Sequence, residues 1–186
     1  MLIDAPLACD EYPASNVADP AEAGTQPMSF AALAEWLAHQ DFPGTHARGI
    51  DGETPLMRAA WQGEDRVVEA LLSYGAEPGD ENDVGNNALW FACLQGGPAT
   101  ILRLIQAGAP IDHTNEDEIT CLMQAAASGR LEIMQMLLAM GARIDLCAPD
   151  GRSAADMAAD RGLQLLRAAR RLAQPRSALS ALPSGS

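Results

Sequence analysis

The segment DGETPLMRAAWQG (residues 51–63) decides the fold, because its pattern returns three more times along the chain. The other three occurrences are VGNNALWFACLQG (84–96), DEITCLMQAAASG (117–129) and DGRSAADMAADRG (150–162). Successive segments start 33 residues apart. A fixed period of this length is typical of repeat architectures, in which each unit buries its apolar face only against its neighbours. The sequence therefore predicts four stacked units.

Each segment predicts a first helix with a capped start, a closely packed middle and a turn at its end. The start is a small polar residue that can accept hydrogen bonds from the first helical N–H groups: Thr54, Asn87, Thr120 and Ser153. The middle is a pair of small residues that lets neighbouring helices approach: 59–60, 92–93, 125–126 and 158–159. The end is a glycine suited to a positive φ: Gly63, Gly96, Gly129 and Gly162.

A second helix is predicted after each glycine. Apolar residues recur there at helical spacing over residues 67–72, 101–105 and 133–138. The last unit continues as LQLLRAARRLAQP (163–175), which we interpret as a polar C-terminal cap. The expected repeats are about 49–81, 82–114, 115–147 and 148–174.

The flanks of the repeats differ from them. Ser29 followed by Phe30, Leu33, Trp36 and Leu37 predicts an amphipathic capping helix over 29–40, which extends the folded domain to 28–174. Residues 1–27 are rich in Ala, Pro and acidic side chains and are expected to form a flexible arm. Residues 175–186 are expected to form a flexible tail.

This pattern resembles the ankyrin-repeat family. The family's T-P-L-H-x-A signature stands here as Thr54-Pro55-Leu56-Met57-Arg58-Ala59, and the resemblance covers residues 29–172. It implies an all-α solenoid of stacked helix-turn-helix units. The family's histidine column departs from the pattern, and we expect mainly apolar packing in its place: Met57, Trp90, Met123 and Asp156.

Composition limits the partners of the chain. Against 25 acidic residues stand 12 basic ones, all arginine, so the formal net charge is −13. Nucleic acids and anionic membranes should be repelled, and a basic or mixed-charge protein partner is favoured. The four cysteines form no CxxC pair, and no signal-peptide pattern or long apolar run is present. We therefore expect a soluble, monomeric, cytoplasmic protein, with secretion by a signal-less route left open.

No pattern in the sequence predicts catalysis. The chain lacks the nucleophile-elbow, phosphate-loop, dinucleotide and zinc-protease motifs, so we expect no catalytic residues, no cofactor and no enzymatic activity. The acids near Asp112 and His113 could gather a cation, but they lack the fixed spacing of an EF-hand or a zinc site, so we interpret them as a solvated acidic loop.

The resemblance implies that loop tips and first helices line a concave surface that holds partners. Trp61 and Leu94 occupy the exposed position after the small pair, and large aromatic rings are frequent binding anchors. The alternative is that Trp61 packs beneath Tyr74 or over the N-terminal helix. Acidic residues recur at the loop tips and would line one edge. The candidate partner-binding residues are Asp51, Glu53, Trp61, Tyr74, Glu81, Asp83, Val84, Asn86, Leu94, Glu116, Asp117 and Ile119.

The predicted function is a non-enzymatic protein-binding module that acts as scaffold, adaptor or inhibitor. Two alternatives remain at this point. The absence of lysine and the acidic arm would suit an effector delivered into a host cell. The acidic charge would equally suit an immunity or regulatory protein that neutralises a basic toxin or enzyme.

Overall fold

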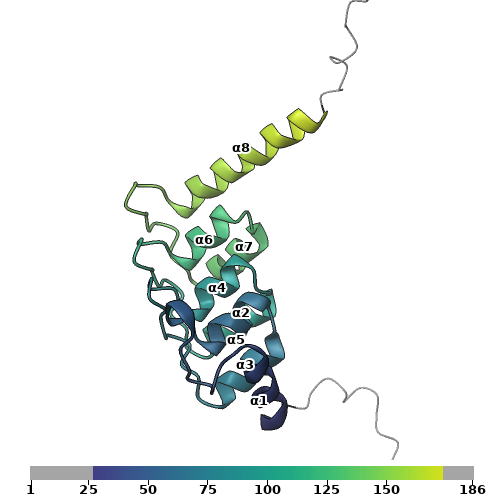
Figure 1. Cartoon of the computed structure of the whole chain (residues 1–186). Coiled ribbons are helices and arrows are strands. Elements are labelled where there is room, and N and C mark those ends of the chain that lie inside the picture. Colours follow the sequence, from purple (N-terminus) through teal and green to yellow (C-terminus); the bar gives the residue numbers. More distant parts are fainter. Residues whose placement is uncertain (1–26, 174–186) are drawn as a thin grey trace, which may run out of the picture.

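A computed structural model describes residues 27–173. The predicted tail, and all of the predicted arm except Pro27, lie outside these residues. Within them the chain forms eight α-helices, one 3-10 turn and no strand. Figure 1 shows the helices stacked in chain order into an elongated solenoid, with the loops between repeats projecting to one side. The predicted all-α solenoid is confirmed.

The N-terminal end is closed by α1 (Phe30–His39). The Ser29 hydroxyl accepts a hydrogen bond from the Ala32 amide at 3.3 Å, as its predicted role as N-cap requires. The helix buries Leu33 and Leu37, and it packs against α3. A 3-10 turn, η1 (Ile50–Gly52), then leads into the first repeat.

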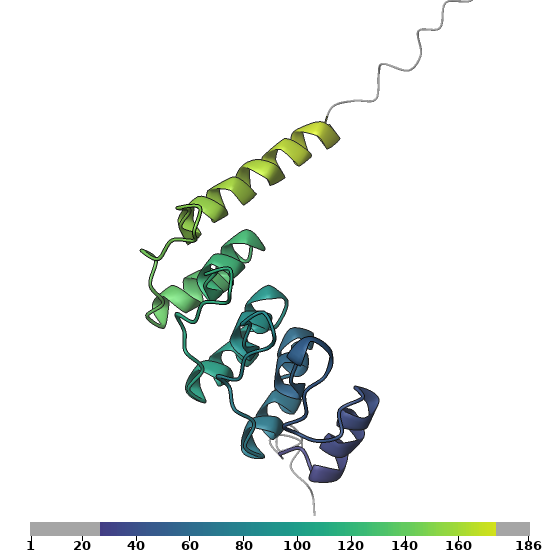
Figure 2. The same cartoon turned by 60° about the vertical axis from the view of Figure 1, so that its left-hand side comes forward.

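Three helix pairs come next. They are α2 (Pro55–Gln62) with α3 (Asp65–Ser73), α4 (Ala88–Leu94) with α5 (Pro98–Gln106), and α6 (Cys121–Ala127) with α7 (Leu131–Ala139). The first helices stack on one another as an inner row, and α3, α5 and α7 form an outer row (Figure 2). The chain ends in α8 (Ala154–Ala173), whose beginning packs on α6.

The predicted helix starts are confirmed in all three pairs. The side chains of Thr54, Asn87 and Thr120 accept hydrogen bonds from amides three residues later, at 3.3, 2.9 and 3.1 Å. Each satisfies a helical N–H that has no partner within the helix. All three cap residues are buried, so these bonds also remove a desolvation cost from the interior.

The small-residue columns lie at the centre of the core. The small residues at 59–60, 92–93 and 125–126 are all 0% exposed, and they belong to the same core cluster as the buried leucines of the inner row: Leu56, Leu89 and Leu122. Short side chains in this column let the inner helices approach closely, and the leucines fill the space between them. The repeat spacing is therefore a consequence of side-chain size.

The replaced histidine column is apolar in three units and polar in the fourth. Met57 and Met123 are buried, and Trp90 is half-buried with its ring edge-on to Phe91 at 5.4 Å. Asp156 instead accepts hydrogen bonds from the Ser153 amide and hydroxyl at 3.0 and 2.7 Å. The fourth residue of the column thus takes part in capping its own helix.

The positive φ predicted for the four glycines is wrong at two of them, although the first helix does end just before Gly96. Gly63 and Gly129 have positive φ as expected, at 70° and 73°, whereas Gly96 and Gly162 do not. Gly96 is required for another reason, since a Cβ there would lie 2.5 Å from the Ala60 carbonyl oxygen. Gly162 lies inside α8, which runs without interruption for 20 residues.

The last unit is therefore one long helix and lacks the predicted helix-turn-helix. A single interior glycine costs a helix only about 1 kcal/mol relative to alanine. Residues 163–173 contain neither proline nor a residue suited to start a new helix, and they are mostly Ala, Leu, Arg and Gln, which favour helix. Among the described residues, no helix is both long and apolar enough to cross a membrane.

Candidate partner-binding surface

The loops between repeats are closed by asparagine side chains. Asn82 Oδ1 accepts hydrogen bonds from the amides of Val84 and Asn86, at 3.3 and 2.8 Å. One repeat later, Asn115 Oδ1 accepts from Asp117 and Ile119 in the same way, at 3.1 and 2.9 Å. This repeated arrangement holds successive loop tips in the same shape.

Backbone hydrogen bonds also join each loop tip to the next. The Asp83 amide donates to the Asp51 carbonyl oxygen at 3.0 Å, and the Glu116 amide donates to that of Val84 at 3.2 Å. His113 Nε2 adds a bond of 2.6 Å to the Gly85 carbonyl oxygen. The tips therefore form a continuous edge along the solenoid.

Asn86 belongs to the inside of this edge. Its side chain is 6% exposed, and Asn115 Nδ2 donates to its Oδ1 at 3.0 Å. Its side chain therefore links two loops and is not available at the surface for contact with a partner. Val84, by contrast, is 48% exposed at the tip of the same loop.

The loop edge carries several carboxylates without a compensating charge. Asp51, Asp83, Glu116 and Asp117 are exposed, and within residues 27–173 none of them forms an ion pair. We call these four residues the acidic edge. Their fields add because the tips lie in one line.

Two other predicted acids have basic neighbours. Glu53 Oε1 accepts from Arg58 Nε at 2.9 Å, and a second bond joins the same two groups. Glu81 lies 3.7 Å from His113 Nδ1. Because the charge of Arg58 offsets that of Glu53, Glu53 contributes less to the negative field of the edge.

A hollow of about 480 Å³ opens beside the acidic edge, between α2 and α4. We call it the first hollow. Trp61, Phe91 and Leu94 supply its apolar wall, and Ile50, which is 86% exposed, stands at its margin. Its full lining is Ile50, Asp51, Glu53, Arg58, Trp61, Asn82, Phe91 and Leu94.

Trp61 and Leu94 thus lie together, as their shared register position predicts. Trp61 is 38% exposed and lines the first hollow. Tyr74 lies elsewhere: its ring meets Phe30 edge-on at 5.4 Å, where α3 packs against α1. The structure separates Tyr74 from the other candidates.

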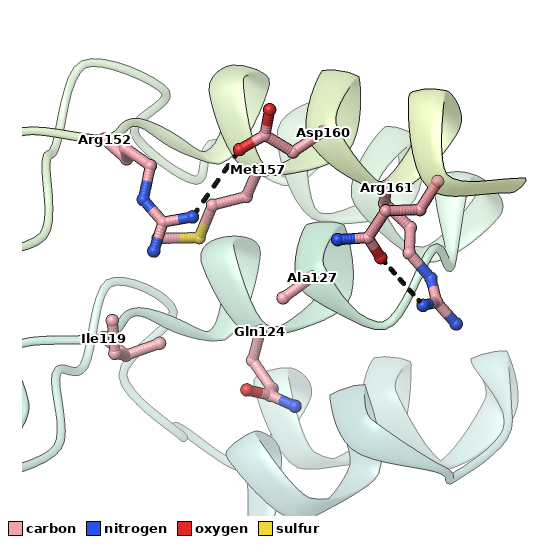
Figure 3. Close-up of a pocket in the computed structure, with 8 residues that line it drawn as sticks. Ile119, Gln124, Ala127, Arg152, Met157, Asp160 and Arg161 are labelled. Carbon is pink, nitrogen blue, oxygen red and sulfur yellow. Dashed lines mark hydrogen bonds and ion pairs between the residues drawn. The ribbon is translucent and has the colours of Figure 1, made fainter. Parts of the chain in front are cut away.

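A second hollow of about 280 Å³ lies between α6 and α8 (Figure 3). It uses register positions equivalent to those of the first hollow, and among its residues are Ile119, Gln124, Ala127, Met157 and Asp160. No aromatic side chain lines it, and the figure shows Arg152 reaching toward Asp160, an ion pair of 3.6 Å. The aromatic character is therefore specific to the first hollow.

Sequence reasoning missed four residues of the first hollow. Ile50, Arg58, Asn82 and Phe91 line it but were not candidates. Two of them could have been found from helical spacing. Arg58 precedes Trp61 by three residues and Phe91 precedes Leu94 by three, so the members of each pair share one helix face. Ile50 carried no such signal, since it lies on the irregular turn η1.

The buried thiols have the environment of packing residues. Cys93 and Cys121 are 0% exposed. A hydrogen bond with Cys93, together with burial, raises the pKa of Cys121 well above its usual value. A protonated, buried thiol is a poor nucleophile. Among residues 27–173 no three His, Cys, Asp or Glu side chains are grouped so that they could hold a metal ion.

Comparison with known protein families agrees with this geometry. A family model described as ankyrin repeat matches residues 51–83, and a model described as ankyrin repeats in three copies matches residues 89–177. The chain belongs to the ankyrin-repeat family. The second match spans α4 through α8, so the unit with the uninterrupted helix is an ankyrin repeat by sequence.

Individual ankyrin-repeat proteins are similar over about half of this chain. The ankyrin repeat domain-containing protein SAT10 of Stachybotrys chartarum is 32% identical over 97 residues, which cover 50% of the chain and 5% of SAT10. NF-kappa-B inhibitor alpha of Mus musculus is 34% identical over 103 residues, covering 52% of the chain and 33% of the inhibitor. The probable palmitoyltransferase AKR2 of Saccharomyces uvarum is 33% identical over 92 residues, which cover 50% of the chain and 13% of AKR2.

The chain thus spans a third or less of the length of these three relatives. What they share with it is the ankyrin-repeat region, and ankyrin repeats generally form non-catalytic interaction folds. This ankyrin-repeat protein is accordingly a protein-protein interaction module.

Proposed function

We propose that the first hollow and the acidic edge together bind a basic segment of a partner protein. The observation that supports this most is their adjacency. Asp51 belongs to both the hollow and the edge, and Trp61 stands in the same hollow. An apolar wall beside uncompensated carboxylates suits a segment that carries an apolar side chain next to Arg or Lys.

The hollow would supply most of the affinity. Interface energy concentrates in a few large side chains, above all Trp, Tyr and Arg, that are enclosed by neighbouring contacts. Trp61 is such a side chain, and it lines the hollow together with Phe91 and Leu94. Filling the hollow would remove their exposed apolar surface from water, at roughly 25 cal/mol per Å².

The acidic edge would supply orientation and speed of association. Exposed charges act over a Debye length of about 8 Å at physiological salt, and a row of like charges steers a partner of opposite sign. Because the edge runs along successive loop tips, it favours an extended basic segment over a single basic residue.

Such a module could act by occluding the surface that it binds. One relative is by its name an inhibitor, NF-kappa-B inhibitor alpha, and its similarity lies in the ankyrin-repeat region. We therefore propose an inhibitory or scaffolding role in the cytoplasm, with a basic or mixed-charge protein as partner.

Selection of peptides from a random display library tests the proposal. We expect binders enriched in Arg or Lys beside an apolar residue, with affinity that falls as salt rises. A Trp61→Ala variant should select no such family, whereas Tyr74→Ala should still select it because Tyr74 lies outside the hollow. Selection of acidic or uncharged peptides, or of one peptide family by all three proteins, would contradict the proposal.

A further inference from the structure

A further hollow lies next to the first hollow, on its N-terminal side. It measures about 340 Å³ and is lined by residues 39–42 at the end of α1, by Gly49, and by Ile50, Glu53 and Arg58. We call it the N-terminal hollow. The last three residues also line the first hollow, so the two hollows share a wall and form one groove. Helix α1 stands at this end of the stack in both views (Figures 1 and 2).

The shared wall carries little net charge. Arg58 Nε donates to Glu53 Oε1 at 2.9 Å, and Nη2 of the same guanidinium donates to Oε2. Both residues are half-buried, and their opposite charges offset each other. Ile50, the third residue of the wall, is apolar and exposed. A peptide segment could therefore lie across this wall without facing an uncompensated charge there.

Asp41 gives the N-terminal hollow a negative charge of its own. It is exposed, and within residues 27–173 its carboxylate forms no ion pair. It follows Gln40, the C-cap of α1, and its φ of 61° lies in the left-handed region that Asp and Asn adopt more readily than most residues. Asp41 lines only the N-terminal hollow, whereas Asp51 lines only the first.

Carboxylates therefore lie on both sides of the first hollow. The acidic edge continues from Asp51 toward the C-terminal end of the solenoid, because backbone hydrogen bonds join its loop tip to that of Asp83 and the latter to that of Glu116. Asp41 lies on the opposite side, toward α1. A partner residue that fills the first hollow would thus have a negative charge beyond each of its two flanks.

We propose that this groove binds a partner segment that carries a basic residue on each side of one apolar residue. The apolar residue fills the first hollow, and one flank runs along the acidic edge. The basic residue of the other flank enters the N-terminal hollow beside Asp41, where its charge complements the carboxylate. The proposal rests on the function proposed for the first hollow, and it adds the second flank to the sequence that the groove recognises.

The ends of the chain itself are the competing occupants. Residues 1–26 contain five acidic residues and no basic one, so like charges would repel them from Asp41 and from the acidic edge. Residues 164–186 contain four arginines and no acidic residue. A second copy of the chain could therefore offer this segment to the groove, and self-association of the protein would reveal it.

Three related peptides test the proposal on the full chain. Display selection on the wild type should enrich Arg or Lys on both sides of an apolar residue. One selected peptide is then compared with two derivatives, in which glutamine replaces the basic residue of one flank or of the other. Titration calorimetry at about pH 8, where histidine side chains are ordinarily uncharged, measures the affinities.

The variant Asp41→Asn should distinguish these peptides. It removes the charge, and Asn adopts the positive φ of this position as readily as Asp does. We expect it to weaken the parent peptide about threefold, as the loss of a single exposed ion pair would, and to leave the affinity of one derivative unchanged. Asp83→Asn combined with Glu116→Gln should show the opposite selectivity between the two derivatives.

Glu35→Gln is the matched control, because Glu35 is exposed on α1 and lines neither hollow. It should change the three affinities equally. Three results would overturn the proposal: selection of basic residues on one flank only, an Asp41→Asn variant that behaves like Glu35→Gln with every peptide, or self-association of the chain that the parent peptide disrupts. If Trp61→Ala still weakens binding in such a case, only the part assigned to the N-terminal hollow fails; if it does not, the function proposed for the first hollow fails too.

Discussion

Arg103 on α5 donates two hydrogen bonds to the carboxylate of Asp65 on α3, with Nε to Oδ1 at 3.0 Å and Nη2 to Oδ2 at 2.8 Å. The two residues come from neighbouring repeats, 38 positions apart. A third group, Glu69, lies 3.3 Å from Arg103 Nη1. This cluster joins the outer helices of the first two repeats.

The cluster predicts a specific dependence of stability on pH. The hydrogen bond from Arg103 lowers the pKa of Asp65 below its ordinary value of 3.8, and burial opposes this only in part. A carboxyl whose pKa is lower in the folded chain stabilises the fold above its unfolded pKa, and this contribution is lost as pH falls through the folded pKa. We expect the difference in melting temperature between wild type and Arg103→Met to be largest near neutral pH and to shrink below about pH 4.

Thermal unfolding, monitored by circular dichroism, measures this difference. Arg143→Met is the control, because the Arg143–Asp145 pair is exposed and lies within one loop. It should change the melting temperature little at any pH. A difference for Arg103→Met that stays constant from about pH 7 to about pH 2 would show that the ion pair has no part in it.

Hydrogen bonds from Arg130 also join neighbouring repeats, and we expect them to contribute to the free energy of unfolding. Its guanidinium donates to the carbonyl oxygens of Ala92 and Cys93 at 2.9 and 3.1 Å, and also to that of Gly96, all at the end of α4. Arg130→Met would keep most of the side chain but leave these carbonyl groups without a partner, at a cost of about 1 to 3 kcal/mol. Urea unfolding should detect this loss, and an Arg152→Met variant, which removes only exposed ion pairs, should unfold within about 0.5 kcal/mol of wild type.

The two glycines that break the predicted pattern should respond oppositely to alanine. At Gly96 a Cβ would meet the Ala60 carbonyl oxygen at 2.5 Å and the Ala92 Cα at 2.8 Å, so Gly96→Ala must push two repeats apart. At Gly162 no atom lies within 4 Å of a built Cβ, and Gly162→Ala should raise the free energy of unfolding by about 1 kcal/mol. Equal effects of the two substitutions in urea unfolding would contradict the structure.

The acidic edge should control the rate of partner association. Neutralising Asp83, Glu116 and Asp117 to Asn or Gln should lower the association rate constant and flatten its dependence on salt, while the dissociation rate constant changes little. Stopped-flow measurement with a basic peptide from the display library would show this. The control neutralises three exposed carboxylates on other elements: Glu35, Glu77 and Glu132. Equal slowing in the control would assign the effect to net charge alone.

Much of the fold could be predicted because local chemistry repeats every 33 residues. Thr54, Asn87 and Thr120 each cap a helix by the same hydrogen bond, and the small pairs are buried wherever a neighbour stacks on them. The end of the array is different. Gly162 stands in the same column as Gly63, yet whether a glycine interrupts a helix depends on the helix propensity of the next residues and on the packing available to them.

The candidate site could be predicted only in part, because its surroundings are set by contacts distant in sequence. The shared register placed Trp61 and Leu94 in one hollow. It did not reveal that Arg58 offsets the charge of Glu53, or that Asn115 from the next loop hydrogen-bonds to Asn86. Such pairings depend on loop geometry, which the repeat pattern does not specify.

The comparison of Trp61→Ala with Tyr74→Ala tests the central claim most directly. The two aromatic side chains are almost equally exposed, at 38 and 41%, but only Trp61 lines the first hollow. Titration calorimetry with a selected basic peptide should show affinity at least about tenfold weaker for Trp61→Ala and unchanged affinity for Tyr74→Ala. Equal affinity of both variants and the wild type would contradict the assignment of the first hollow as the binding site.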